Sequence, residues 1–213
     1  MAKLPGGLNV GRTGLTETAA RAEGFDVVTA TAAVDDKAHY YPGSGVLLIK
    51  LTADRASRKL LGVQVLGPGA VDKVTDIAVT AISLGAAVDQ LAGLDFAYAP
   101  PFSTAIHPFA TALNVLLNKM DGGMESVTPA EYAAGAAEGC EIVDCGRAPF
   151  LEGRRYLGLG SIDGPVEGLG RDDKILLVCN KGKQAYLVQN RLKFYGYTNT
   201  KVLEGGAAAT EVE

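Results

Sequence analysis

The feature that most constrains the fold is a break in the sequence pattern at residues 119–125, where Gly122 and Gly123 lie among charged residues. A long helical pattern ends at this segment, and a new order of strand and helix signals begins after it. With 213 residues, of which 47% are hydrophobic, the chain is long enough for two small cores. We therefore expect two domains, over residues 8–120 and 126–206.

Charge and hydropathy exclude two classes of partner. The formal net charge is -4 and the isoelectric point lies near 5.3, which gives no electrostatic reason to expect binding to nucleic acid or to an anionic membrane surface. Apolar runs such as 46–51 and 175–178 are much shorter than the roughly 20 residues of a membrane span. The N-terminus also lacks the apolar core of a signal peptide. We expect a cytoplasmic protein.

The cysteine content favours a reactive thiol over a disulfide or a metal ligand. Cys140, Cys145 and Cys179 are odd in number and lack metal-ligand spacing, so we predict neither a disulfide framework nor a metal site.

The pattern before residue 119 indicates an α+β domain with an antiparallel sheet. Strands are expected at 25–31, 46–51 and 60–67, with the last two paired as a hairpin. Three- and four-residue apolar spacing then predicts helices over 70–82, 88–94 and 104–120. The last helix is expected to bury one apolar face, formed by Ile106, Phe109, Leu113, Leu116 and Leu117.

The pattern after residue 126 indicates a small α/β domain with a parallel sheet. Thr128, Pro129 and Glu131 have the order of an N-cap, a first helical residue and a capping-box acid. Short aliphatic runs at 142–143, 175–178 and 201–203 suit buried parallel strands, and residues 185–194 suit a crossover helix.

Cys179 is the best candidate for a reactive group. It follows an apolar strand and precedes a short basic glycine loop that leads into a helix. Backbone N–H groups at a helix N-terminus and nearby lysines favour the thiolate, which is the nucleophilic form of cysteine. The alternative is a buried cysteine that only packs at the end of a core strand.

The loop after Cys179 has the composition of an anion cradle. Asn180, Lys181, Gly182, Lys183 and Gln184 supply backbone N–H groups and two positive charges, and the glycine permits a tight backbone path. These residues are predicted to hold a persulfide on Cys179.

The other two cysteines receive different predictions. Cys140 is expected in a loop or at the surface. Cys145 lies at the carboxyl end of its strand, the same edge as Cys179 if the two strands are parallel. It can therefore be either a packing residue or a resolving thiol.

The segment Cys179-Asn180-Lys181-Gly182-Lys183-Gln184 resembles the active-site loop of rhodanese-like sulfurtransferases. Residues 128–131, 142–144 and 202–206 resemble that family's opening helix, aspartate-bearing strand and closing segment. The resemblance implies that Cys179 accepts a sulfane sulfur and passes it on as a persulfide. The chain departs from the family at Gln184, where arginine is usual, and at Arg154, where histidine is usual. In addition, two residues separate Asp144 from Arg147, whereas the family has one residue between its aspartate and arginine.

Residues 8–120 resemble the dimerisation domain of the pyridine nucleotide-disulfide oxidoreductases, in the coenzyme A-disulfide reductase and persulfide reductase branch. The motifs that carry the resemblance are Gly14-Leu15-Thr16-Glu17, Tyr40-Tyr41-Pro42-Gly43, residues 61–67 and 71–78, and Tyr98-Ala99-Pro100-Pro101. The resemblance implies a homodimer in which this domain completes the partner's active site. It also implies a coenzyme A site near Tyr98 and either Tyr40 or Tyr41. His107 is expected to have a structural or interface role rather than a catalytic one, and His39 has no partner that the sequence identifies.

Motifs for redox cofactors are missing from the sequence. It contains no Gly-x-Gly-x-x-Gly after a strand. The full-length family implies FAD, NAD(P)H and coenzyme A, whereas this chain resembles a C-terminal part without the FAD and NAD domains. We therefore expect no bound cofactor and no flavin oxidoreductase activity from the chain alone. Separately encoded flavin and nicotinamide domains are possible partners.

Two functions follow from these patterns. The first is rhodanese-type sulfur transfer on a reductase dimerisation domain, with small sulfur donors and thiols as substrates. The second is a non-catalytic dimerisation and binding module, a fragment of a flavin-dependent reductase, in which the loop ending at Gln184 is inactive.

Overall fold

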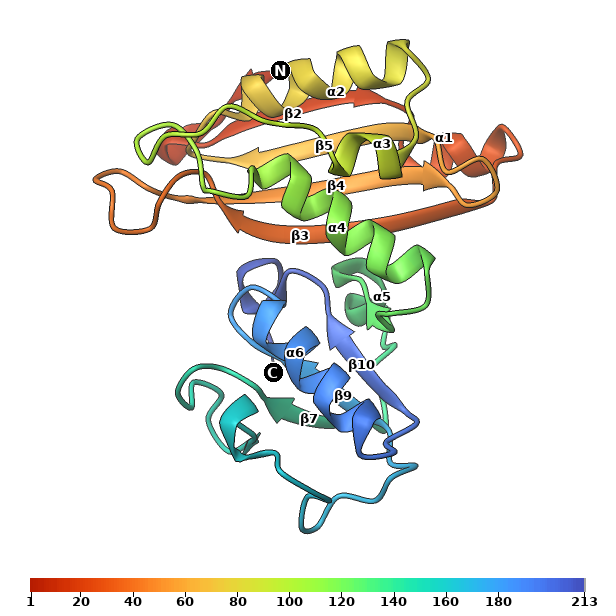
Figure 1. Ribbon diagram of the computed structural model, residues 1–213, viewed down its shortest axis with the longest axis vertical. Helices are drawn as coiled ribbons and strands as arrows, with labels where there is room; N and C mark the ends of the chain where they lie inside the picture. The colour runs from red at the N-terminus through yellow and green to blue at the C-terminus, as the bar shows by residue number, and fades with distance from the viewer. Residues whose placement is uncertain (213) are drawn as a thin grey trace. The chain divides into compact units, whose positions relative to one another are not determined.

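The computed structural model describes residues 1–212 (Figure 1). It divides into two compact units, Met1–Met120 and a second that begins at Asp121. Each unit has its own sheet and its own core. No helix within residues 1–212 is long and apolar enough to cross a bilayer.

The first unit is built on a five-stranded antiparallel sheet with the order β1-β2-β5-β4-β3. Its strands are β1 Ala2–Lys3, β2 Asn9–Gly14, β3 Val27–Asp35, β4 Val46–Asp54 and β5 Leu60–Gly67. The predicted hairpin of β4 and β5 is confirmed, and β3 pairs along the other edge of β4. The α+β class with an antiparallel sheet is therefore correct for this unit.

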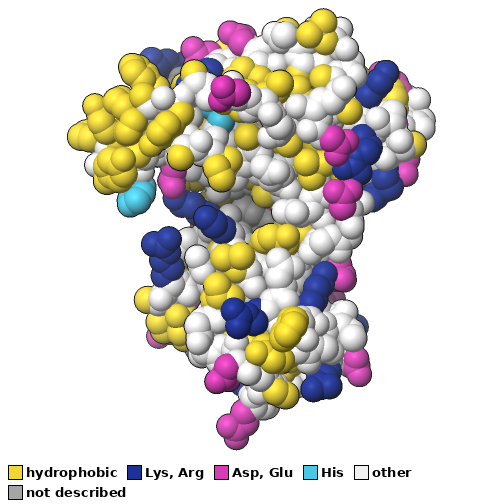
Figure 2. Space-filling model, viewed as in Figure 1, with side chains coloured by type: hydrophobic (Ala, Val, Ile, Leu, Met, Phe, Trp, Pro, Cys, Tyr) yellow, Lys and Arg dark blue, Asp and Glu magenta, His cyan; other side chains and the backbone are white. Residues whose placement is uncertain are grey.

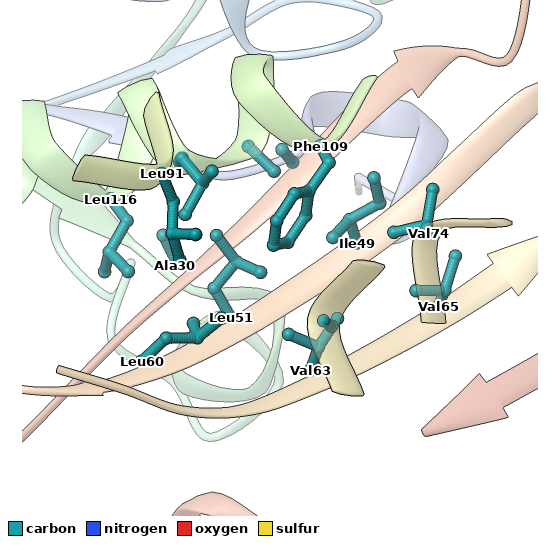
Figure 3. Close-up of a cluster of buried hydrophobic side chains, with 14 of the residues drawn as sticks. Ala30, Ile49, Leu51, Leu60, Val63, Val65, Val74, Leu91, Phe109 and Leu116 are labelled. Atoms are coloured by element: carbon teal, nitrogen blue, oxygen red, sulfur yellow. The ribbon is translucent and has the colours of Figure 1, made fainter. Parts of the chain in front are cut away.

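Helices pack on one face of this sheet. They are α2 Val71–Ser83, α3 Val88–Ala92 and α4 Pro108–Met120, while the short α1 Glu17–Ala22 lies beside one end of the sheet (Figure 1). Helix α2 contacts β5 and β2, α4 contacts β3 and β4, and α3 packs on α4. Figure 3 shows Ile49, Leu51 and Phe109 in the core between strands and helices. These side chains are fully buried, which is the main stabilising contribution to such a layer.

The prediction of a helix from residue 104 was wrong at its start, because α4 begins at Pro108. Ile106, expected on the buried face, is 64% exposed. Proline is favoured at the first helical position, and the Phe109 N–H donates to Nδ1 of the preceding His107 at 3.2 Å. Burial lowers the pKa of His107 to about 4, so the ring is neutral at pH 7 and its Nδ1 can accept this bond. His107 also stacks on Phe96, and its role is structural.

Strand β2 was not predicted, because its sequence carries two glycines and lacks an apolar alternation. The structure gives a reason for one of them: a Cβ at Gly11 would lie 2.3 Å from the Thr75 hydroxyl oxygen of α2. Close approach of helix and strand therefore requires glycine here, although glycine weakens the strand signal.

The second unit has a five-stranded sheet in which every neighbouring pair is parallel, with the order β6-β10-β9-β7-β8. The strands are β6 Ser126–Val127, β7 Glu141–Asp144, β8 Arg155–Tyr156, β9 Ile175–Val178 and β10 Thr200–Leu203. The helices are α5 Pro129–Ala133 and α6 Lys183–Phe194. The predicted parallel sheet and crossover helix are confirmed. Thr128 and Glu131 also form the predicted capping box of α5.

Candidate functional site

Cys179 lies one residue beyond the end of the central strand β9, where the chain turns toward α6. Its side chain is 3% exposed. The Sγ atom accepts a hydrogen bond from the backbone N–H of Ala185, in the first turn of α6, at 3.4 Å. The N-cap residue of α6 is Gly182, which has no side chain to accept a bond from the first turn. The sulfur therefore takes the place of a capping oxygen and lies at the positive end of the helix dipole.

The loop between Cys179 and α6 depends on a glycine. Gly182 is the N-cap of α6 and has φ 85°, in the left-handed region. Asn180 and Lys183 are exposed, while Lys181 and Gln184 are half-buried. The structure thus brings the predicted loop residues together around one end of the helix, and it places the two lysines on either side of the glycine.

A second glycine segment, which follows β10, lies against this loop and binds it through backbone hydrogen bonds. The N–H groups of Ala207 and Ala208 donate to the carbonyl oxygens of Cys179 and Asn180 at 3.0 and 2.9 Å. Gly205 and Gly206 both have positive φ, and a Cβ at Gly206 would lie 1.9 Å from the Cys179 carbonyl oxygen. Only glycine allows this approach. Sequence reasoning did not identify these backbone contacts, although the glycine pair was a signal for them.

Asp144 organises the neighbouring loop after β7. The carboxylate is fully buried and accepts hydrogen bonds from the N–H groups of Gly146, Phe150 and Leu151 at 2.8, 2.6 and 2.9 Å. The aspartate therefore holds the loop over residues 145–151 in a closed turn, which is a structural role.

Replacing Asp144 by asparagine is expected to destabilise the second unit by about 1–3 kcal/mol, because the amide group brings a donor among backbone donors that need an acceptor. Chemical denaturation of the variant measures this loss. Asp163→Asn is the matched control, because Asp163 is exposed. Equal stability of both variants would show that the buried carboxylate is not needed for this turn.

The remaining cysteines occupy different environments. Cys140 lies half-buried in the loop before β7, as predicted. Cys145 is 1% exposed, follows β7, and lies at the same sheet edge as Cys179. Burial raises the pKa of the Cys145 thiol well above its usual range, with smaller contributions from Cys179 and Asp144. Cys145 is therefore a protonated thiol at neutral pH.

The two arginines that depart from the rhodanese pattern, Arg147 and Arg154, are both exposed. They lie in the loop between β7 and β8. Within residues 1–212, no group of three or more His, Cys, Asp or Glu side chains is placed to hold a metal ion.

The tyrosines of the first unit lie on two segments that meet. The Ala38 N–H donates to the Pro100 carbonyl oxygen at 3.4 Å, which joins the segment of Tyr40 and Tyr41 to that of Tyr98. Their side chains are 69%, 38% and 52% exposed, respectively. Figure 2 shows hydrophobic side chains gathered at one end of this unit beside a histidine. The structure thus brings the predicted aromatic residues into one neighbourhood.

Each of the two units matches a known protein family. Residues 6–110 match the dimerisation domain of the pyridine nucleotide-disulphide oxidoreductases, and residues 124–211 match the rhodanese-like domain. The chain joins a reductase dimerisation domain to a rhodanese-like domain. Both resemblances seen in the sequence are therefore confirmed.

Curated relatives match about half of the chain. The chain is 38% identical over 109 residues to the NAD(P)H sulfur oxidoreductase (CoA-dependent) of Pyrococcus furiosus, covering 51% of this chain and 24% of that protein. It is 37% identical over 109 residues to the NAD(P)H coenzyme A polysulfide/persulfide reductase of Pyrococcus horikoshii, with the same coverage. The chain thus spans about a quarter of the length of these relatives.

Solved structures match most of the chain. An NAD-dependent persulfide reductase from A. fulgidus matches with a TM-score of 0.85 and 33% identity, over 95% of this chain and 37% of that one. The reduced CoADR-RHD of Bacillus anthracis matches with a TM-score of 0.83 and 28% identity, over 94% and 37%. The dimerisation and rhodanese-like domains are thus related to parts of coenzyme A-dependent persulfide and disulfide reductases.

Proposed function

We propose that the rhodanese-like domain transfers sulfane sulfur through a persulfide on Cys179. The observation that carries the proposal is the hydrogen bond from the Ala185 N–H to Sγ, which aims the positive end of α6 at the sulfur. A persulfide anion carries its charge on the outer sulfur, and a glycine loop at a helix N-terminus is a backbone arrangement that suits such an anion. Exposed Lys183 adds positive charge near the loop.

The reaction has two displacement steps. In the first, the Cys179 sulfur attacks the outer sulfur of a sulfane donor such as thiosulfate; the donor bond breaks, and sulfite leaves with the bonding electron pair. In the second, an acceptor nucleophile attacks the outer sulfur of the persulfide, and Cys179 leaves as a thiolate. The loop stabilises the anion present at each stage.

The intact mass of the chain tests this proposal. A brief incubation with thiosulfate, followed by alkylation, is expected to add one sulfur atom, roughly 32 Da, to the wild-type chain. Cys140→Ser is expected to gain the same mass, since Cys140 lies outside the loop, and Cys179→Ser is expected to gain none. No added sulfur in any chain, with thiosulfate or with polysulfide, would remove sulfur transfer and leave the binding function described next.

The second candidate is a non-catalytic dimerisation and binding module. The burial of Cys179 favours it, because a donor must reach a thiol that is only 3% exposed. Gln184 favours it too, because a neutral amide replaces the bidentate charge of the arginine that is usual in the family.

We also propose that the first unit forms a homodimer and that Tyr98 and either Tyr40 or Tyr41 face a coenzyme A thiol there. The dimerisation-domain match and the meeting of the two tyrosine segments support this proposal. The relatives named for coenzyme A and NAD(P)H suggest that these two cofactors belong to a larger assembly. The reductase family resemblance adds FAD to it, with flavin and nicotinamide domains as partners. Three free cysteines suit the reducing cytoplasm, in which we place this chemistry.

Light scattering is expected to give a mass twice that of the 22.1 kDa chain at micromolar concentration, since an interface domain of this family associates through its own surface. A dilution series measures the stability of the dimer. A mass of one chain throughout the series would contradict the homodimer.

A further inference from the structure

A second thiol lies beside Cys179 at the same sheet edge. Strands β7 and β9 pair in parallel, with Val143 opposite Leu177 and Asp144 opposite Val178. The pairing continues one step further, because the Cys145 N–H donates to the Val178 carbonyl oxygen at 2.6 Å. Cys145 and Cys179 are the next residues on the two chains. Neighbouring strands lie about 4.8 Å apart, which falls within the Cα separation of about 4.4–6.8 Å that a disulfide spans.

Strand alternation places both cysteines on the same face of the sheet. Leu176 and Val178 contribute to the cluster that also contains Ile142, so these residues face one side. Because successive side chains alternate, Cys179 and Cys145 face the other side. The hydrogen bond from Ala185 agrees, since it turns the Cys179 sulfur toward α6.

The surroundings separate the roles of the two thiols. Both are buried, at 1% exposure for Cys145 and 3% for Cys179. The raised pKa of Cys145 comes first from burial and then from the nearby Cys179 sulfur. Little of Cys145 is therefore thiolate at neutral pH, and Cys179, whose sulfur accepts the Ala185 N–H at the start of α6, is assigned the attack on the external donor.

We propose that Cys145 is a resolving thiol, which attacks the Cys179 persulfide and closes a disulfide between the two cysteines. This inference rests on the proposed sulfur transfer. It adds a second reaction to the domain: release of hydrogen sulfide without an external thiol acceptor.

The step is balanced without a further oxidant. The Cys145 sulfur attacks Sγ of Cys179, and the bond between that Sγ and the outer sulfur breaks. The outer sulfur takes the bonding electrons and the proton of the Cys145 thiol, and it leaves as hydrogen sulfide. Cys145 is oxidised and the sulfane sulfur is reduced. Two molecules of a low-molecular-weight thiol then restore both cysteines and form one molecule of their disulfide.

The internal step is expected to be slower than sulfur loading, because little of Cys145 is thiolate at neutral pH. Thiol and disulfide rearrangements that lack a catalyst take minutes to hours. An external thiol that reaches the persulfide earlier takes the sulfur, so the internal reaction operates when acceptors are scarce.

Trypsin provides a direct readout of this disulfide. Cleavage after Lys174 and Lys181 isolates Cys179 in the peptide 175–181, whereas Cys140 and Cys145 share the peptide 120–147. The full chain is loaded with thiosulfate in the absence of oxygen, freed of excess donor and followed over hours. The measurements are hydrogen sulfide and non-reduced peptides, in the wild type, Cys145→Ser and the control Cys140→Ser.

The wild type and Cys140→Ser are expected to release about one equivalent of hydrogen sulfide per persulfide and to join the two peptides. Cys145→Ser is expected to keep its persulfide and to release less than about a tenth as much. A wild-type persulfide as long-lived as that of Cys145→Ser, with no joined peptides, would overturn this inference and leave the proposed sulfur transfer standing. Failure of both the wild type and Cys145→Ser to take up sulfur would overturn the sulfur transfer, and the resolving step with it.

Discussion

Alanine in place of Cys179 is expected to reduce thiocyanate formation from thiosulfate and cyanide to the rate seen without protein, a loss of at least about a hundredfold. The reason is chemical: both displacement steps pass through this sulfur, and the Ala185 N–H then has no anion to stabilise. The measurement is the colorimetric rate of thiocyanate formation at saturating donor.

A control variant and a limit on the residual rate complete that experiment. Cys140→Ala removes a half-buried thiol from the loop before β7, outside the proposed persulfide cradle, and it is expected to retain the wild-type rate. A Cys179→Ala chain with more than half of the wild-type rate would show that the sulfur passes through another group.

Alanine in place of Gly206 is expected to dislodge the loop that carries Cys179. Left-handed backbone costs a residue with a Cβ about 1–2 kcal/mol, and here that Cβ would also meet the Cys179 carbonyl oxygen at 1.9 Å. The chain must move at one of the two segments, which breaks the bonds from Ala207 and Ala208. We expect faster hydrogen exchange at these amides and loss of most sulfur transfer.

Alanine substitutions at two other glycines distinguish the cost of left-handed backbone from the effect of the close contact with the Cys179 carbonyl oxygen. Gly139 has φ 73° with open space around its Cβ position, so Gly139→Ala carries the backbone cost alone. Gly164 has open space and no positive φ, so Gly164→Ala is expected to be neutral. If Gly206→Ala behaved like Gly139→Ala, with the loop amides still protected, the close approach to Cys179 would not be what holds the loop.

Local pattern predicted the elements whose apolar spacing is regular. The hairpin of β4 and β5, helix α2, and the passage from β9 to α6 follow from hydrophobic periodicity and turn residues, and with them the place of Cys179 at a strand-to-helix junction. The cluster of Thr128, Pro129 and Glu131 was similarly informative, because an N-cap motif is contained within four residues.

The features that escaped prediction depend on contacts between distant parts of the chain. Gly11 in β2 makes room for α2, and Gly206 makes room for the Cys179 carbonyl, although each looks like a weak point in its own segment. The start of α4 depends on His107, whose ring nitrogen accepts the Phe109 N–H at the beginning of the helix. One sheet edge was predicted for Cys145 and Cys179 if their strands are parallel, but their adjacency also required the strand order, which places β7 beside β9.

The measurement that tests the central claim most directly is the site of the added sulfur. After brief loading with thiosulfate and alkylation, tryptic peptides of the wild type and of Cys145→Ser report which cysteine holds it, since Cys179 alone lies in 175–181. We predict one added sulfur on 175–181 and none on 120–147. Added sulfur on 120–147 alone, or on neither peptide, would contradict a persulfide carried by Cys179.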